Sequence, residues 1–179
     1  MTIKPWKILS STHLRDRIRL DQCELPNGKV IEGTVFEFRN WVTVLGLTKQ
    51  QEVVLIRQYR HGAQKVIVEL PGGVMDAEEE SPLFAARREL QEETGYTSDR
   101  LIQVGCVSPN PAIQTNLIYS FLALDAEKVS NQHLDEAEEI EVLLKPLDDV
   151  VTMAKNGELF QTMQVSTVFF TLAYLNRIP

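Results

Sequence analysis

The chain has 179 residues, of which 44% are hydrophobic and 24% charged, and its formal net charge is −7. These values are ordinary for a soluble globular protein with one domain, with or without a small appendage, and large enough to bury a core. The negative charge argues against a non-specific nucleic-acid binder, which would carry a basic stripe, but it is compatible with a phosphorylated substrate.

The start of the chain and its two cysteines indicate the compartment. The first 20 residues mix charges throughout and contain no continuous apolar region, so we expect no signal peptide. No apolar run approaches the ~20 residues of a membrane span. Cys23 and Cys106 lie far apart without metal-ligand spacing, which favours buried free thiols. We therefore expect a cytoplasmic protein with no membrane partner.

Residues 1–40 are predicted to form a small antiparallel sheet. Strand-like segments run from Asp16 to Leu20 and from Val30 to Phe38, with Pro26-Asn27-Gly28 between them. Asn-Gly between β-prone runs is typical of a hairpin turn. An isolated sheet of this size needs a partner surface to cover one face. We therefore assign residues 1–40 to an N-terminal β region and residues 41–179 to the main domain.

The main domain is predicted to alternate strands with helices. Strands are expected at residues 41–47, 52–59, 65–70, 101–107, 116–124 and 140–144. A central helix follows Ser81 and Pro82, which suit the N-cap and the first helical position. Two further helices are expected near residues 147–156 and 165–175. This order favours an α/β fold, in which a mixed sheet has helices on both faces.

The central helix carries three glutamates on one side. Glu89, Glu92 and Glu93 stand at positions i, i+3 and i+4. Like charges at i,i+4 destabilise a helix by roughly 0.2–0.5 kcal/mol per pair, and Mg²⁺ removes this cost by binding carboxylate oxygens. The alternative is a solvated acidic helix that Arg87 and Arg88 partly neutralise.

The sequence around these glutamates resembles a known motif. The stretch from Gly72 to Tyr96 reads GGVMDAEEESPLFAARRELQEETGY. Its part from Arg88 to Tyr96 resembles the Arg-Glu-apolar-X-Glu-Glu-X-Gly-apolar half of the Nudix box, and Glu80 matches the upstream glutamate of that box. The box has five residues between its leading glycine and this glutamate, whereas Gly73 to Glu80 leaves six, so the acidic loop carries one extra residue. The chain is identified as a member of the Nudix superfamily.

The resemblance extends beyond the box. The segments from Val53 to Arg60 and from Glu69 to Gly73 are similar to those of the ADP-ribose pyrophosphatase branch. That branch implies a Nudix α/β/α sandwich with a mixed sheet, preceded by the small N-terminal antiparallel sheet. It also implies a homodimer whose N-terminal strands cross to the neighbouring subunit. The implied activity is hydrolysis of the diphosphate bond of nucleoside diphosphate sugars, above all ADP-ribose to AMP and ribose 5-phosphate, with Mg²⁺ as cofactor or Mn²⁺ as its substitute.

The resemblance assigns roles to the residues of the box. By motif position, Glu89 and Glu93 are metal ligands, and the backbone carbonyl of Gly72 is a third. Glu92 is a further ligand or an assisting base. Two residues are expected to orient this cluster through a salt bridge: Arg88 and Glu80.

A second acidic run, from Asp135 to Val142, precedes the last predicted strand. Its charge pattern alone favours a solvated loop. A Glu-X-Glu sequence before a strand also resembles the catalytic loop of ADP-ribose pyrophosphatases. This match makes Glu136 the expected general base and Glu138 another metal ligand, although a slip of one residue among these glutamates stays open.

Four residues are expected to bind the substrate. Arg57 and Arg60 end a strand that leads to the site, and guanidinium groups bind phosphate oxygens bidentately, the alternative being exposed strand charges. Glu69 is expected to accept from a sugar hydroxyl. Trp6 resembles an adenine-stacking tryptophan of some relatives, or else it pins the N-terminal sheet to the core. The histidines are interpreted as surface residues, of which only the second lies near the site: His13, His61 and His133.

Other activities compete with this interpretation. A Nudix hydrolase can act on GDP-mannose, on other sugar nucleotides or on nucleoside triphosphates, and the flanking sequences favour sugar nucleotides. A non-enzymatic alternative is a Nudix-fold nucleotide sensor. Such sensors often lose box carboxylates and carry a DNA-binding domain, whereas this chain keeps its three glutamates and shows no segment suited to a helix-turn-helix appendage.

Overall fold

The computed structural model describes residues 4–76, 81–136 and 138–178, so Glu80 of the box lies outside the described residues. The chain divides into two compact units. The first holds Met1–Arg39 and Ser108–Leu117, and the second holds Asn40–Val107 and Ile118–Pro179. The segment 108–117 was expected in the main domain, as a loop followed by the start of a strand, but it is part of the first unit. The Phe36 N–H donates to the Ile113 carbonyl oxygen, and the Thr115 N–H donates to the Phe36 carbonyl oxygen.

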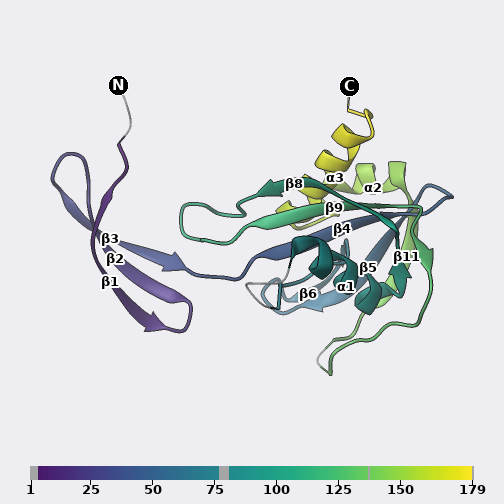
Figure 1. The fold of residues 1–179 in the computed structure, drawn as a ribbon, viewed down its shortest axis with the longest axis horizontal. Coiled ribbons are helices and arrows are strands. Elements are labelled where there is room, and N and C mark those ends of the chain that lie inside the picture. The colour runs from purple at the N-terminus through teal and green to yellow at the C-terminus, as the bar shows by residue number, and fades with distance from the viewer. Residues whose placement is uncertain (1–3, 77–80, 137, 179) are drawn as a thin grey trace. The chain divides into compact units, whose positions relative to one another are not determined.

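The first unit is a three-stranded antiparallel sheet in the order β1-β2-β3 (Figure 1). Its strands are β1 (Lys7–Arg15), β2 (Ile18–Glu24) and β3 (Val30–Phe36). The predicted turn joins β2 to β3, and Gly28 adopts φ = 81° there. β1 was not predicted, because every residue of this strand is exposed and its sequence does not alternate between apolar and polar residues.

The second unit contains a six-stranded mixed sheet. The strand order is β11 (Glu141–Pro146), β5 (Glu52–Arg60), β4 (Trp41–Leu47), β9 (Ile118–Leu124) and β8 (Arg100–Val107), and β6 (Lys65–Glu69) also pairs with β5. Strands β4 and β9 are parallel, and the other pairs are antiparallel. A separate two-stranded sheet joins β7 (Tyr96–Thr97) to β10 (Glu127–Lys128).

Helices cover both faces of the large sheet (Figure 1). Helix α1 (Pro82–Thr94) packs on one face, where Val42 and Val44 of β4 contribute to its core. Helices α2 (Leu147–Asn156) and α3 (Thr162–Tyr174) cover the other face, to which Leu45 and Leu47 contribute. Alternate residues of one strand thus enter two different cores. This arrangement is the α/β/α sandwich that the sequence predicts.

The predicted start of α1 is confirmed, and its end has a local cause as well. The Ser81 side chain accepts a hydrogen bond from the Phe84 N–H, and proline occupies the first helical position. At the other end Gly95 takes the left-handed conformation with φ = 75°, and its N–H donates to the carbonyl oxygen of Gln91. The burial of Ala86 and Leu90 fixes the rotation of the helix, and this rotation decides where its glutamates lie.

Two further findings concern membrane-spanning helices and the cysteines. No helix in the described part of the chain is long and apolar enough to cross a membrane. Cys23 and Cys106 are free thiols, as expected. Only Cys23 is buried, so the expectation of a buried thiol is wrong for Cys106, which lies on the edge strand β8 of the sheet.

Candidate active site

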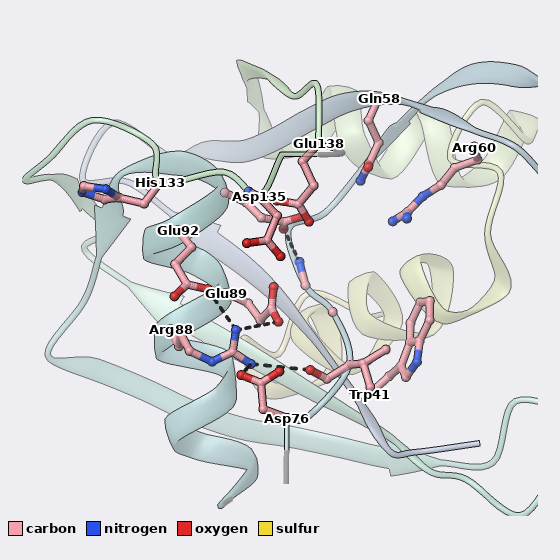
Figure 2. Close-up of a pocket in the computed structure, with 14 residues that line it drawn as sticks. Trp41, Gln58, Arg60, Asp76, Arg88, Glu89, Glu92, His133, Asp135 and Glu138 are labelled. Atoms are coloured by element: carbon pink, nitrogen blue, oxygen red, sulfur yellow. Dashed lines mark hydrogen bonds and ion pairs between the residues drawn. The ribbon is translucent and has the colours of Figure 1, made fainter. Parts of the chain in front are cut away.

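A cavity of about 410 Å³ lies beside α1 in the second unit (Figure 2). Its walls come from α1, from the turn after β6, from β4 and β5, and from the loop before β11. The residues that line it are Trp41, Gln58, Arg60, Gly72, Gly73, Val74, Asp76, Arg88, Glu89, Glu92, Glu93, His133, Asp135 and Glu138. Six of these side chains are carboxylic acids and two are arginines, so the cavity favours a cation.

The glycine turn after β6 runs close against β4. The carbonyl oxygens of Pro71 and Gly73 accept hydrogen bonds of 2.9 Å from the N–H groups of Val44 and Val42. Gly72 lies between them with φ = 153°, and a Cβ atom at this position would come within 2.2 Å of the Val42 carbonyl oxygen. Only glycine allows this approach.

The same turn contacts the glutamates of α1. The Gly72 N–H donates a hydrogen bond of 2.7 Å to the carboxylate of Glu93. A Cβ atom on Gly73 would lie 2.7 Å from both carboxylate oxygens of Glu89. The two glycines therefore let the backbone reach both carboxylates, which brings the start and the end of the predicted motif together.

Burial makes the charged form of Glu93 unfavourable. The residue is 5% exposed, and this burial raises the pKa of its carboxyl group to about 8. The Gly72 N–H opposes the shift, while the charges of Glu89 and Glu138 add to it. Without a cation, the Glu93 carboxyl group therefore binds a proton near neutral pH.

Glu89 responds to the same surroundings. The pKa of its carboxyl group is raised to about 7, chiefly by burial and to a smaller extent by the charges of Glu92 and Glu138. Arg88 opposes the shift through its charge and its hydrogen bond. Because Glu138 acts on both Glu89 and Glu93, the loop before β11 brings its carboxylate close to the two glutamates of the helix.

Arg88 lies within this cluster, as Figure 2 shows. Its guanidinium group donates hydrogen bonds of 3.0 Å to Glu89 and 2.9 Å to Glu92, and it lies 3.3 Å from the carboxylate of Asp76. It also reaches the Val74 carbonyl oxygen at 3.5 Å. One cation thus links the glutamates of α1 to the chain that follows the glycine turn.

The two arginines of strand β5 lie in different surroundings. Gln58 and Arg60 stand two residues apart and both line the cavity. Arg57 does not line it, and its Nε donates a hydrogen bond of 3.0 Å to Glu141 on the paired strand β11. The structure thus differs from the expectation for Arg57, because neighbouring residues of a strand face opposite sides.

Glu69 is fully buried and does not line the cavity. Its carboxylate accepts hydrogen bonds of 2.8 Å from Arg60 and 3.2 Å from Gln58, and another from Gln161. Burial raises the pKa of this carboxyl group, and Arg60 opposes the shift. The structure thus places Glu69 behind the two cavity residues of β5 rather than in the position expected for contact with a sugar hydroxyl.

The loop before β11 brings some of its predicted residues to the cavity. Asp135 and Glu138 line it and bond to each other, because the Asp135 N–H donates to the Glu138 carboxylate at 3.1 Å. Glu136, the predicted base, is exposed and is not among the lining residues. His133 and His61 are both exposed, as expected, but His133 lines the cavity and His61 does not, so the expectation that only His61 lies near the site is wrong.

A family model described as the NUDIX domain matches residues 37–163. The chain belongs to the Nudix family. It is 31% identical over 142 residues to the ADP-ribose pyrophosphatase of Bacillus subtilis (strain 168), which covers 79% of this chain and 76% of that protein. It is 32% identical over 164 residues to the GDP-mannose pyrophosphatase of Salmonella arizonae, with 86% and 85% covered.

The Nudix fold is also seen in a solved structure. The crystal structure of an ADP compounds hydrolase matches this chain with a TM-score of 0.86 at 23% identity, over 99% of this chain and 100% of that one. At this identity the likeness concerns the fold. The family model and the relatives confirm the resemblance to the ADP-ribose pyrophosphatase branch that the sequence indicates.

The donor set of this Nudix site suits a hard divalent cation. Within the described ranges, no group of three or more His, Cys, Asp or Glu side chains is arranged closely enough to hold a metal ion. The carboxylates nevertheless line one cavity, and two of them have raised pKa values that a cation would lower again. Oxygen donors of this kind are those that Mg²⁺ prefers.

Sequence reasoning missed several residues that line the cavity: Trp41, Gln58, Asp76, His133 and Asp135. Two of them carried a signal, because Gln58 precedes Arg60 by two residues in a strand and Asp135 opens the acidic run. Trp6, predicted to stack on a base, belongs to the first unit and is 56% exposed, and its role stays a prediction.

Proposed function

We propose that this Nudix protein hydrolyses the diphosphate bond of nucleoside diphosphate sugars, with ADP-ribose as its main substrate and AMP and ribose 5-phosphate as products. The observation that carries the proposal is the convergence of Glu89, Glu93, Glu138 and Arg60 on one cavity. Family membership and two relatives named as pyrophosphatases support a pyrophosphohydrolase.

Mg²⁺ is the proposed cofactor, with Mn²⁺ as a substitute. Its proposed ligands are the carboxylates of Glu89, Glu93 and Glu138 and the carbonyl oxygen of Gly72, while Glu92 is a further ligand or an assisting base. A divalent cation neutralises a diphosphate and lowers the pKa of a bound water. The excess of carboxylates over arginines in the cavity supports this assignment.

Other side chains have proposed roles in phosphate binding, in positioning and in proton transfer. Arg60 is proposed to bind phosphate oxygens, since it lines the cavity and Glu69 fixes the orientation of its guanidinium group. Arg88 holds Glu89 and Glu92 in place through hydrogen bonds. Glu136 is proposed to accept the proton of the attacking water, which then reaches phosphorus in line with the leaving phosphate. Its place on the loop between the lining residues Asp135 and Glu138 supports this role.

Residues 1–40, which make up most of the first unit, are proposed as the dimerisation region, and residues 41–179 are proposed as the catalytic domain. Strand β1 is exposed along its whole length, which supports a partner surface. Trp6 or the stacked rings of Phe36 and Phe38, whose centroids lie 5.6 Å apart, are proposed to hold the base. We propose the cytoplasm as compartment, in line with two free thiols.

A second candidate substrate is GDP-mannose, because the relative from Salmonella arizonae carries that name at 32% identity. The two substrates can be separated by measuring phosphate release in a reaction coupled to a phosphatase. The panel holds ADP-ribose, GDP-mannose, UDP-glucose, a dinucleoside diphosphate and ATP, each with Mg²⁺ and with EDTA. The matched control is the Glu93→Gln variant.

We expect ADP-ribose to give the highest kcat/KM, and release to require the divalent cation. A higher kcat/KM for GDP-mannose would favour the second candidate. A preference for ATP would contradict the sugar-nucleotide assignment. Metal-independent release, or equal release by Glu93→Gln, would contradict the proposed site.

A further inference from the structure

The chain after β10 passes around the C-terminal end of α1. The last carbonyl groups of a helix lack partners within the helix. Here the N–H groups of Val129 and Ser130 donate to the Gly95 carbonyl oxygen at 2.9 and 3.2 Å. A Cβ atom on Gly95 would lie 2.2 Å from the Ser130 carbonyl oxygen, so glycine also permits this close contact.

Two further carbonyl groups of α1 are bonded by the next residues of the chain. The His133 N–H donates to the Glu92 carbonyl oxygen at 2.8 Å. The side-chain amide of Gln132 donates to the Glu93 carbonyl oxygen at 2.6 Å and to the Ile140 carbonyl oxygen at 3.1 Å. One amide nitrogen thus uses its two hydrogens to join the end of α1 to both ends of the loop between Gln132 and Ile140.

These hydrogen bonds connect the two segments of the chain that supply carboxylates to the cavity. Glu89 and Glu93 come from α1, whereas Asp135 and Glu138 come from the loop whose base Gln132 closes. Glutamine suits this place because it donates two hydrogen bonds and adds no charge beside the carboxylates. A lysine would place a cation close to the cavity, and a glutamate would face two carbonyl oxygens without a donor.

We propose that Gln132 is a positioning residue, which sets the loop carboxylates against the glutamates of α1. This inference rests on the function proposed above. Gln132 does not line the cavity, so it acts through the loop rather than on the substrate. A misplacement of about 1 Å in a catalytic group can lower the rate about 10²-fold, which makes such a tie important for turnover.

The test compares Gln132→Met, which keeps the length of the side chain and removes both donors, with Gln132→Glu, which replaces the amide by a carboxylate. The matched control is Gln103→Met, since Gln103 is exposed on β8 and does not line the cavity. We expect kcat to fall about 10- to 100-fold in both Gln132 variants while KM changes little. Gln103→Met keeps the turnover of the unchanged protein.

A double-mutant cycle with Glu138→Gln separates positioning from general destabilisation. If Gln132 acts through the loop, Gln132→Met lowers kcat much less in the Glu138→Gln background than in the unchanged protein. The two losses of kcat are then not additive. Additive losses would overturn the inference, because a change in overall folding lowers turnover equally in both backgrounds. Wild-type kcat in both Gln132 variants would overturn it as well.

Amide hydrogen exchange provides a readout that needs no substrate. Gln132→Met is expected to speed exchange in the loop, at residues 134–136 and 138–139, and to leave β4 and β5 unchanged. If exchange in the loop stays as slow as in the unchanged protein, the inference that Gln132 holds the loop is wrong. If the unchanged protein hydrolyses no diphosphate at all, the proposed function fails, and hydrogen exchange still decides whether Gln132 holds the loop.

Discussion

At the scale of single residues, Glu93 shows how a binding site costs stability. The side chain is nearly fully buried, and the Gly72 N–H and the charge of Arg60 favour its charged form against burial and two neighbouring glutamates. In a metal-free protein, a hydrophobic residue or a neutral amide at this position would destabilise the folded state less. Such a costly group is typical of a site where activity, rather than stability, has fixed the residue.

We expect Glu93→Gln to abolish activity and to stabilise the metal-free protein. The pKa of this carboxyl group rises from 4.5 to about 8 on folding, so the unfolded chain loses the proton first. The free energy of unfolding in EDTA therefore falls as the pH rises from about 4.5 to about 8, and the variant loses much of this dependence. Denaturant titrations of both proteins at pH 5 and pH 8 in EDTA measure this pH dependence of the free energy of unfolding.

Two outcomes would contradict this prediction. One is near-normal turnover of Glu93→Gln at saturating Mg²⁺, which would remove Glu93 from the ligands. The other is an unchanged pH dependence of unfolding, which would mean that the carboxyl group titrates normally in the folded protein. Glu158→Gln is a suitable control, because Glu158 is exposed and does not line the cavity.

At the scale of elements, strand β5 decides which polar residues reach the cavity. Its antiparallel pairing with β11 and β6 fixes the direction of each side chain. Gln58 and Arg60 face the cavity over the buried Glu69, whereas Arg57 forms an exposed ion pair with Glu141. Two arginines of similar sequence context thus have different surroundings.

This difference gives a matched pair of substitutions. We expect Arg60→Ala to raise KM about 10- to 100-fold, since a hydrogen bond to a charged group contributes about 1.5–3 kcal/mol. Arg57→Ala removes an exposed ion pair worth less than about 1 kcal/mol, so KM and stability change little. Steady-state kinetics with ADP-ribose measure both. A larger effect from Arg57→Ala would show that the substrate approaches the other side of β5.

At the scale of the whole molecule, the chain consists of two units with different cores. The second unit buries two apolar clusters, one on each face of its sheet. The first unit leaves β1 exposed, with Trp6, Ile8 and Leu14 each more than half accessible. A small sheet of this kind is stable only with a surface to cover it, and a second copy of the chain is the partner proposed here.

We expect the protein to sediment as a dimer and the double substitution Ile8→Lys with Leu14→Lys to shift it toward the monomer. Charges on an interface strand lose apolar contact and repel their copies across a two-fold axis. Val66→Lys serves as control, since Val66 is 58% exposed on β6 of the second unit. A fully active monomer of the unchanged protein would contradict the proposal, and dissociation by Val66→Lys alone would place the interface elsewhere.

The sequence by itself determined the helix that carries the chemistry. Ser81, Pro82 and Gly95 fix the ends of α1 through local backbone preferences, and the spacing of Glu89 and Glu93 puts them on one side of it. Strand β4 and helix α2 were likewise predicted with their observed bounds, because their apolar patterns reflect direct burial. Local rules and a motif were sufficient for these elements.

The tertiary structure decided which of the remaining residues meet. Arg57 and Glu69 look like substrate-binding residues in the sequence, but strand pairing turns the first away and buries the second. Asp135 and His133 reach the cavity because hydrogen bonds to the end of α1 fix the path of their loop. These placements depend on contacts between residues that lie 39 to 92 positions apart in the sequence, which local preferences do not encode.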